Sequence, residues 1–123
     1  HITDIHCSVT GAPRYFVQIL FNDVPSENYF LAGKLLEEDN IYVHGHIREG
    51  RTTEAKQQIM ADIMNAVASE TGADPSCLQV YITDIPASQV AEFGSVVPEP
   101  GEEQAWEDAQ SSTAKERMAR LSA

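Results

Sequence analysis

The 123-residue sequence is poor in basic residues and in cysteine, and it contains no long apolar run. Eight lysines and arginines stand against nineteen aspartates and glutamates, which gives a formal net charge of −11. Nucleic acids and anionic membrane surfaces are bound by basic patches, so this charge disfavours both as partners. No segment is apolar enough to span a bilayer, and none has the basic-then-apolar order of a secretory signal.

The two cysteines, Cys7 and Cys77, are too few for a disulfide framework. Neither belongs to a CxxC motif, and without a visible secretory signal they fit a reducing interior. We therefore expect small buried apolar residues at both positions and a cytoplasmic protein. With 42% hydrophobic and 22% charged residues, the overall composition is that of an ordinary globular chain.

One stretch of the sequence occurs twice, at a constant offset and without a gap. The letters TGA at residues 10–12 recur at residues 71–73, and VQILFNDVP at residues 17–25 recurs as LQVYITDIP at residues 78–86. A repeat of this kind indicates a fold built from two copies of one unit. Positions at which the copies differ in chemistry then become candidates for function rather than packing.

The second copy has the pattern of a βαβ unit. Ile41–Ile47 and Leu78–Thr83 are rich in β-forming residues, and Thr52–Glu70 carries apolar residues every four positions. A threonine can cap the start of this helix, and Gly72 is placed to end it. The order strand, helix, strand favours parallel pairing of the two strands.

The first copy follows the same order. An apolar face predicts a helix that ends at Gly11, and Tyr15–Phe21 predicts a strand. Asn28–Lys34 predicts a short strand or hairpin, and Ala87–Phe93 predicts a short helical turn in the second copy. The offset leaves the first copy without its first strand and half of its first helix. We therefore expect a segment of about twenty residues to precede His1.

These elements predict an α/β fold (an α+β sandwich) with a four-stranded, mainly parallel sheet and two helices on one face. The tandem βαβ domain would span residues 1–97. Residues 98–123 would form an acidic C-terminal extension with weak helical signals, following a turn rich in proline and glycine. Trp106 is placed to anchor this extension on the body, and Thr113-x-x-Glu116 predicts a capping box.

Two arginines, Arg48 and Arg51, lie where the strand at 41–47 passes into the following helix. In open α/β sheets, ligands bind beyond the carboxyl ends of parallel strands, near a helix N-terminus. Two guanidinium groups there would form an anion site, because the fork of arginine matches a carboxylate in bidentate fashion. The alternative is a solvated turn in which the arginines pair with Glu49 or Glu54.

The repeat singles out two further positions. His6 aligns with Val67, a core position of the second helix, and Tyr81 aligns with Leu20. Each departs from the packing pattern and is a candidate for function. The alternatives are a satisfied buried histidine and a core tyrosine. Glu92 is another candidate, although a single glutamate is weak evidence by itself.

His44 and His46 lie on one face of the strand at 41–47, because their spacing is two residues. A metal site would need a third ligand in register, and the sequence offers none. We therefore expect no metal here, and solvent-facing or site-lining histidines instead.

Several motifs together resemble the tautomerase superfamily and, within it, the cis-3-chloroacrylic acid dehalogenase group. They are ITDIH at residues 2–6, VHGHIREGR at 43–51, VYITDIP at 80–86, EFG at 92–94, PEPGE at 98–102, and Trp106. The likeness runs from His1 to about Trp106, with the motifs in one order, which makes it specific to the subgroup.

The resemblance implies two consecutive βαβ units assembled as a homotrimer. It implies that Arg48 and Arg51 bind and polarise a substrate carboxylate. It further implies that Glu92 activates water with the help of Tyr81, and that His6 lies near the substrate. No metal or organic cofactor is required.

Members of the group also use an N-terminal proline as general acid or base. Because residue 1 is His1, within a predicted helix, this proline would belong to the expected preceding segment. The implied reaction is addition of water to a small α,β-unsaturated or 3-halo carboxylate. The alternatives are a keto–enol tautomerase of the phenylpyruvate or 2-hydroxymuconate type, and a non-catalytic trimeric protein of the same fold.

Overall fold

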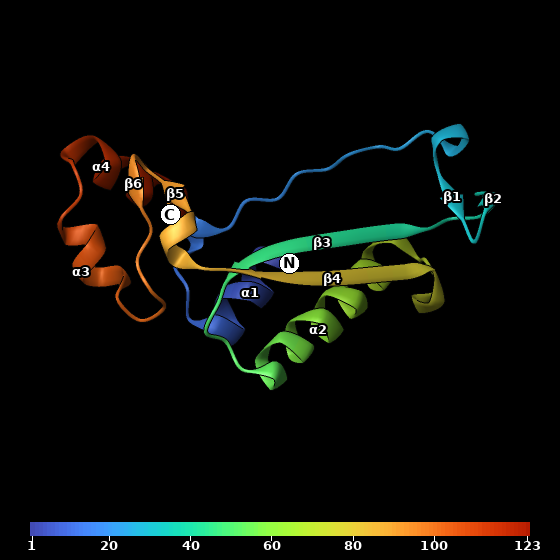
Figure 1. The fold of residues 1–123 in the computed structure, drawn as a ribbon, viewed down its shortest axis with the longest axis horizontal. Coiled ribbons are helices and arrows are strands. Elements are labelled where there is room, and N and C mark those ends of the chain that lie inside the picture. Colours follow the sequence, from blue (N-terminus) through green and yellow to red (C-terminus); the bar gives the residue numbers. More distant parts are fainter.

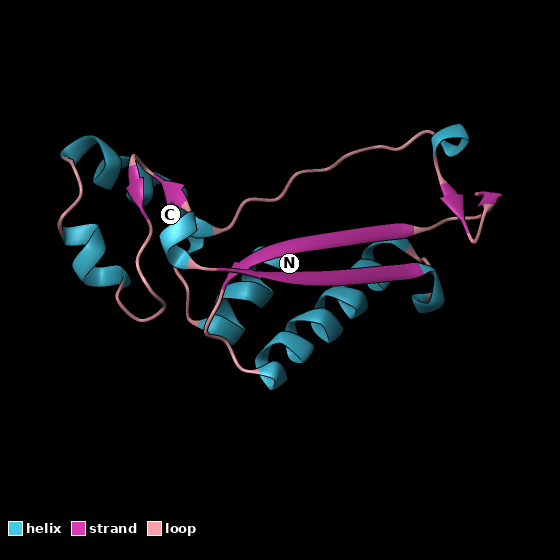
Figure 2. Cartoon of the chain, viewed as in Figure 1, coloured by secondary structure: helices cyan, strands magenta, loops and turns pink.

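The computed structural model describes residues 1–123 and shows a βαβ body, an extended arm and a group of C-terminal helices (Figures 1 and 2). The helices are α1 (Ile2–Thr10), α2 (Thr53–Thr71), α3 (Glu103–Asp108) and α4 (Ser112–Ser122), with 3₁₀ turns η1 (Arg14–Phe16), η2 (Ser26–Asn28), η3 (Pro75–Cys77) and η4 (Ala87–Gln89). The strands are β1 (Phe30–Leu31), β2 (Lys34–Leu35), β3 (Ile41–Arg48), β4 (Leu78–Ile85), β5 (Ala91–Glu92) and β6 (Ser95–Val96).

The body is built on β3 and β4, which pair in parallel along their whole length. Both α1 and α2 lie on one side of this ladder (Figure 1). The buried face of α2 carries Ile59 and Ile63, as its four-residue apolar spacing predicts. The Thr52 hydroxyl caps the helix by accepting from the Ala55 N–H at 3.1 Å, and Gly72 ends it in the left-handed conformation. The predicted βαβ unit and its parallel pairing are therefore confirmed.

The duplicated sequence folds into a duplicated structure. Each copy continues from a helix through a left-handed glycine, a 3₁₀ turn, an extended stretch and a second 3₁₀ turn into a hairpin. The threonines that end the two helices even make equivalent bonds. Thr10 Oγ1 donates to the His6 carbonyl at 2.7 Å, and Thr71 Oγ1 donates to the Val67 carbonyl at 2.7 Å.

Both copies end in a tight hairpin, β1–β2 and β5–β6. The turn residues are Ala32-Gly33 in the first and Phe93-Gly94 in the second, and all four have positive φ. Two consecutive positive φ angles are characteristic of the type I′ turn, whose twist matches that of paired strands. The predicted hairpin after Asn28 is confirmed. The helical turn predicted after Pro86 is limited to η4, because the chain then enters β5.

The predicted strand at Tyr15–Phe21 is wrong. Its first residues form η1, and the rest is an extended arm without a strand partner. Leu20 and Phe21 on this arm are 80% and 91% exposed. The arm has the residue pattern of its repeat, β4, but a strand also requires a hydrogen-bonded neighbour, and β3 pairs with β4 only. The body sheet therefore holds two strands, β3 and β4, whereas three of the four predicted strands were expected within these residues.

The C-terminal helices pack against η1 and the second hairpin. Tyr15, Ala114 and Met118 form the buried centre of this contact, and three further aromatic side chains surround it: Phe16, Phe93 and Trp106. The Trp106 indole N–H also donates to the Val96 carbonyl at 2.8 Å, so the predicted anchoring role of Trp106 is confirmed. No helix in the structure is both long and apolar enough to cross a membrane.

The capping box predicted at Thr113 is wrong. α4 begins one residue before Thr113, and its cap is Ser111, whose hydroxyl accepts from the Ala114 N–H at 3.2 Å. Cys7 and Cys77 are free thiols, as expected, and both are half-buried rather than fully buried.

Met118 is 1% exposed, so Met118→Ala should leave a cavity between α4 and η1. We expect it to lower the free energy of unfolding by about 2–5 kcal/mol, as measured by urea denaturation. Leu121→Ala is the matched control on the same helix. Because Leu121 is 51% exposed, its truncation should change stability by only about 0.5 kcal/mol. Equal effects of the two variants would show that α4 is not docked through Met118.

Candidate active site

The candidate site begins where β3 ends. Arg48 is the last residue of β3, and the chain turns through Gly50, whose φ is 109°, before α2 starts beyond Arg51. A side chain at Gly50 would be strained at this φ, so glycine suits the sharp passage from strand to helix. The turn brings both arginines to the carboxyl end of the parallel ladder, the edge at which α/β sheets bind ligands.

The Arg48 guanidinium is held on three sides. Its Nη1 donates to the Pro98 carbonyl at 2.6 Å, and its Nη2 donates to Glu103 Oε1 at 2.7 Å. Its central carbon lies 4.9 Å from the centre of the Phe16 ring, within range of a cation–π contact. The side chains of Arg48 and Glu103 are only 9% and 15% exposed. Neither Glu49 nor Glu54 pairs with an arginine here, so the solvated-turn alternative does not describe Arg48.

Arg51 and His6 lie beside Arg48. Arg51 Nη1 donates to the Arg48 carbonyl at 3.0 Å, and burial together with the Arg48 charge lowers the pKa of Arg51. His6 projects from α1, and its Nδ1 is buried without a hydrogen-bond partner. Burial, and then repulsion from Arg51 and Arg48, lowers the pKa of His6, which favours the neutral imidazole. The structure thus places Arg48, Arg51 and His6, all three predicted from the sequence as site residues, close to one another.

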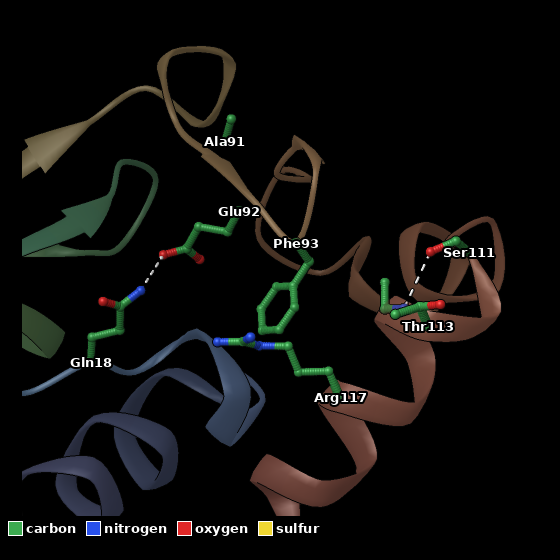
Figure 3. Close-up of a pocket in the computed structure, with 8 residues that line it drawn as sticks. Gln18, Ala91, Glu92, Phe93, Ser111, Thr113 and Arg117 are labelled. Carbon is green, nitrogen blue, oxygen red and sulfur yellow. Dashed lines mark hydrogen bonds between the residues drawn. The ribbon is translucent and has the colours of Figure 1, made fainter.

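Glu92 lies on β5 and lines a cavity of about 450 Å³ (Figure 3). The cavity is lined by Gln18, Ala91, Glu92, Phe93, Ser111, Thr113, Ala114 and Arg117. Burial raises the pKa of Glu92, although the Arg48 charge and a 3.4 Å bond from the Gln18 amide to Oε1 oppose the rise. A half-buried carboxyl with a raised pKa has the character of a general base or acid.

Tyr81 lies apart from the other candidates. It is 56% exposed on β4, opposite His44 of β3, and its ring meets the Tyr42 ring edge-on at 5.1 Å. It lies four positions before the last residue of β4, which places it about 13 Å back along the strand. A single chain therefore does not bring Tyr81 to Glu92.

The histidine pair shares this exposed face of β3. The rings of His44 and His46 lie 4.6 Å apart, and His44 Nε2 is 2.8 Å from the Thr83 hydroxyl. No group of three or more histidine, cysteine, aspartate or glutamate side chains is placed to hold a metal ion.

The structure adds residues that the sequence did not single out. Gln18 was hidden by the repeat, because its counterpart in the second copy, Gln79, is also glutamine. Glu103 and Arg117 lie in the C-terminal part, where the charge pattern showed only an acidic tail. One signal was available for Glu92: its counterpart in the first copy is Leu31, an exchange of an apolar residue for an acid.

Residues 1–111 match the model of a protein family described as "Putative oxalocrotonate tautomerase enzyme". The chain belongs to this tautomerase family. It is also similar to the crystal structure of N1, a member of the cis-3-chloroacrylic acid dehalogenase (cis-CaaD) family. The TM-score is 0.91 at 34% identity, over 97% of this chain and 83% of that one. This match supports the assignment of the chain to the cis-CaaD-like subgroup of the tautomerase superfamily, with the α+β tautomerase-type fold.

Other tautomerases are similar over smaller parts. A fused 4-OT, described as a wild-type asymmetric trimer, has a TM-score of 0.68 at 26% identity, over 77% of each chain. A protein named as a probable tautomerase in Lactococcus lactis subsp. lactis (strain IL1403) is 33% identical over 55 residues. That match covers 45% of this chain and 90% of the relative. Because proteins of the tautomerase superfamily are generally enzymes, these relatives support the interpretation of this chain as an enzyme.

The contact between Gln18 and Glu92 can be tested by titration. Because the Gln18 amide favours the ionised carboxylate, Gln18→Ala should raise the pKa of Glu92 further, as followed by ¹³C NMR of the carboxyl carbon. Gln79→Ala is the matched control, because the Gln79 amide faces Asn40 Oδ1 at 3.5 Å and not Glu92. Superimposable Glu92 titrations in the two variants would contradict the contact.

Proposed function

We propose that this chain forms the site of a cofactor-free hydratase or hydrolytic dehalogenase acting on a small α,β-unsaturated carboxylate. The observation that supports it best is the placement of Arg48. This residue belongs to the arginine pair at the end of β3, and its charge also acts on Glu92 at the cavity. A site with cations at one end and a raised-pKa carboxyl at the other suits attack of water on a small acid.

The arginines would bind the substrate carboxylate. Arg51 has no acidic partner within ion-pair distance, and Arg48 uses one N–H of each Nη on protein groups, which leaves further donors. Charge-assisted bonds to the carboxylate draw electron density away from the C2=C3 bond and make C3 electrophilic. Neutral His6 beside them would contribute a hydrogen bond without adding charge.

Glu92 would act as the general base for water. In the proposed step the carboxylate accepts a proton from water as the water oxygen bonds to C3, and the C2=C3 electron pair takes a proton at C2. A pKa raised by burial makes the Glu92 carboxylate a stronger base toward water. Tyr81 would assist only if a neighbouring chain supplied it, which agrees with the trimer that we propose from the family resemblance.

The proton for C2 would come from the N-terminal proline implied by the resemblance. When C3 carries a halogen, the addition product is a 3-halo-3-hydroxy acid. Loss of halide and of the hydroxyl proton then leaves a 3-oxo acid, so no oxidant, metal or organic cofactor is needed.

A keto–enol tautomerase is the second candidate function. It is favoured by the family description, which names an oxalocrotonate tautomerase. The arginines would then hold an enol acid, and the proline would act as a base. Water activation at Glu92 would have no role in that reaction.

Glu92→Gln separates the two candidates. We expect it to lower hydration of propiolate or dehalogenation of 3-chloroacrylate by about 10²–10⁴-fold, because the general base is lost. Ketonisation of phenylenolpyruvate should fall little. Glu116→Gln, on the exposed side of α4, is the matched control and should leave both reactions unchanged. Undiminished hydration in Glu92→Gln would exclude the proposed mechanism. If phenylenolpyruvate is turned over faster than either unsaturated acid, the tautomerase is favoured.

The proposed proline can be tested on the protein isolated from its own cells. Intact mass and N-terminal sequencing should reveal a free proline about twenty residues before His1. A mature N-terminus without proline would remove the general acid from the proposal and favour the non-catalytic trimer.

A further inference from the structure

The orientation of Arg48 is determined by the loop that leads into α3. Three groups of this loop converge: the Pro98 carbonyl and the Glu103 carboxylate accept from the two Nη atoms of Arg48, and Gly101 holds Glu103. The Phe16 ring lies against the guanidinium at 4.9 Å. An arginine guanidinium has five N–H donors. These contacts determine which of the Arg48 donors bind protein groups and which remain for a ligand.

The Glu103 carboxylate is itself held in one orientation, unlike a carboxylate that is free in solvent. Its Oε1 accepts from Arg48 at 2.7 Å, and its Oε2 accepts from the Gly101 N–H at 2.8 Å. The two oxygens are thus committed to different donors, and the carboxylate has one orientation. Because the Arg48 and Glu103 side chains are 9% and 15% exposed, water competes little for this pair.

The charge of Glu103 also matters for the second arginine. Burial lowers the pKa of Arg51, and the charge of the neighbouring Arg48 lowers it further, because the two cations repel. A carboxylate bound directly to Arg48 reduces that repulsion. Glu103 thereby stabilises the placement of the two guanidinium groups side by side. Arg51 is then the cation of the pair that has no acidic partner.

We propose that Glu103 is a positioning residue, which holds Arg48 in the orientation that presents its remaining N–H donors to the substrate carboxylate. This inference rests on the proposed function, in which Arg48 and Arg51 bind that carboxylate. Glu103 touches no substrate atom in it and acts through Arg48. The C-terminal helices are then part of the binding site, because the residue that orients Arg48 is the first residue of α3.

The first experiment measures steady-state kinetics with propiolate in Glu103→Ala and Glu103→Gln. In Glu103→Ala, Arg48 should be misplaced and kcat/KM should fall about 10²-fold. Most of this fall should come from a higher KM, because binding of the substrate carboxylate is weakened. Glu103→Gln keeps one acceptor oxygen for Arg48 and should recover part of the loss. Glu102→Gln is the matched control: its exposed side chain makes no hydrogen bond and its charge change is the same.

The second experiment observes Arg48 without any substrate. Held by Pro98 and Glu103, its Nη protons should give separate ¹H–¹⁵N NMR signals in the parent protein, whereas exposed Arg120 gives averaged ones. Glu103→Ala should average the Arg48 signals, and Glu102→Gln should leave them separate.

The outcomes distinguish the two proposals. If Arg48→Ala leaves propiolate turnover intact, the proposed function fails, whatever Glu103 does. If Arg48→Ala abolishes turnover but Glu103→Ala matches Glu102→Gln in KM, the positioning role fails. Tighter binding of propiolate in Glu103→Gln would also overturn it, because Glu103 would then be an internal competitor for Arg48.

Discussion

The ion pair between Arg48 and Glu103 joins the βαβ body to the C-terminal helices. Arg48 ends β3 and Glu103 begins α3, and both side chains are largely shielded from water. Because this pair is largely shielded from water, removal of one partner would leave the other charge poorly compensated and weaken the contact. The placement of α3 and the orientation of a candidate substrate-binding arginine are therefore coupled through one contact.

The aromatic cluster around this pair supports the other half of the candidate site. Phe16 lies against Arg48, and Phe93, next to Glu92 in sequence, packs edge-on to the Tyr15 ring at 5.5 Å. Phe93 also occupies a positive φ in the β5–β6 turn, a conformation that is rare for a bulky residue. Its packing against the cluster compensates for that strain. Arg48 thus contacts the aromatic cluster directly, and Glu92 is connected to it through the adjacent Phe93.

Elements with local signals could be predicted. α2 has a capping threonine, a regular apolar face and a terminal glycine, and its predicted limits agree with the structure to within a residue or two. The strand predicted at Tyr15–Phe21 had an equally good pattern and was wrong, because β-structure needs a hydrogen-bonded neighbour that a local pattern cannot supply. The capping box at Thr113 failed for a related reason: Ser111 offered a competing cap two residues earlier.

The sequence by itself determined the repeated unit, the parallel pairing of β3 with β4, and which residue types depart from the repeat. Helical periodicity, caps and turn residues act over a few neighbouring positions, so they can be read along the chain. Only the tertiary structure decided that Arg48 meets Glu103, that Gln18 reaches Glu92, and that Tyr81 stands apart from both. These contacts join residues distant in sequence, and their geometry follows from how the hairpin and the C-terminal helices pack on the body.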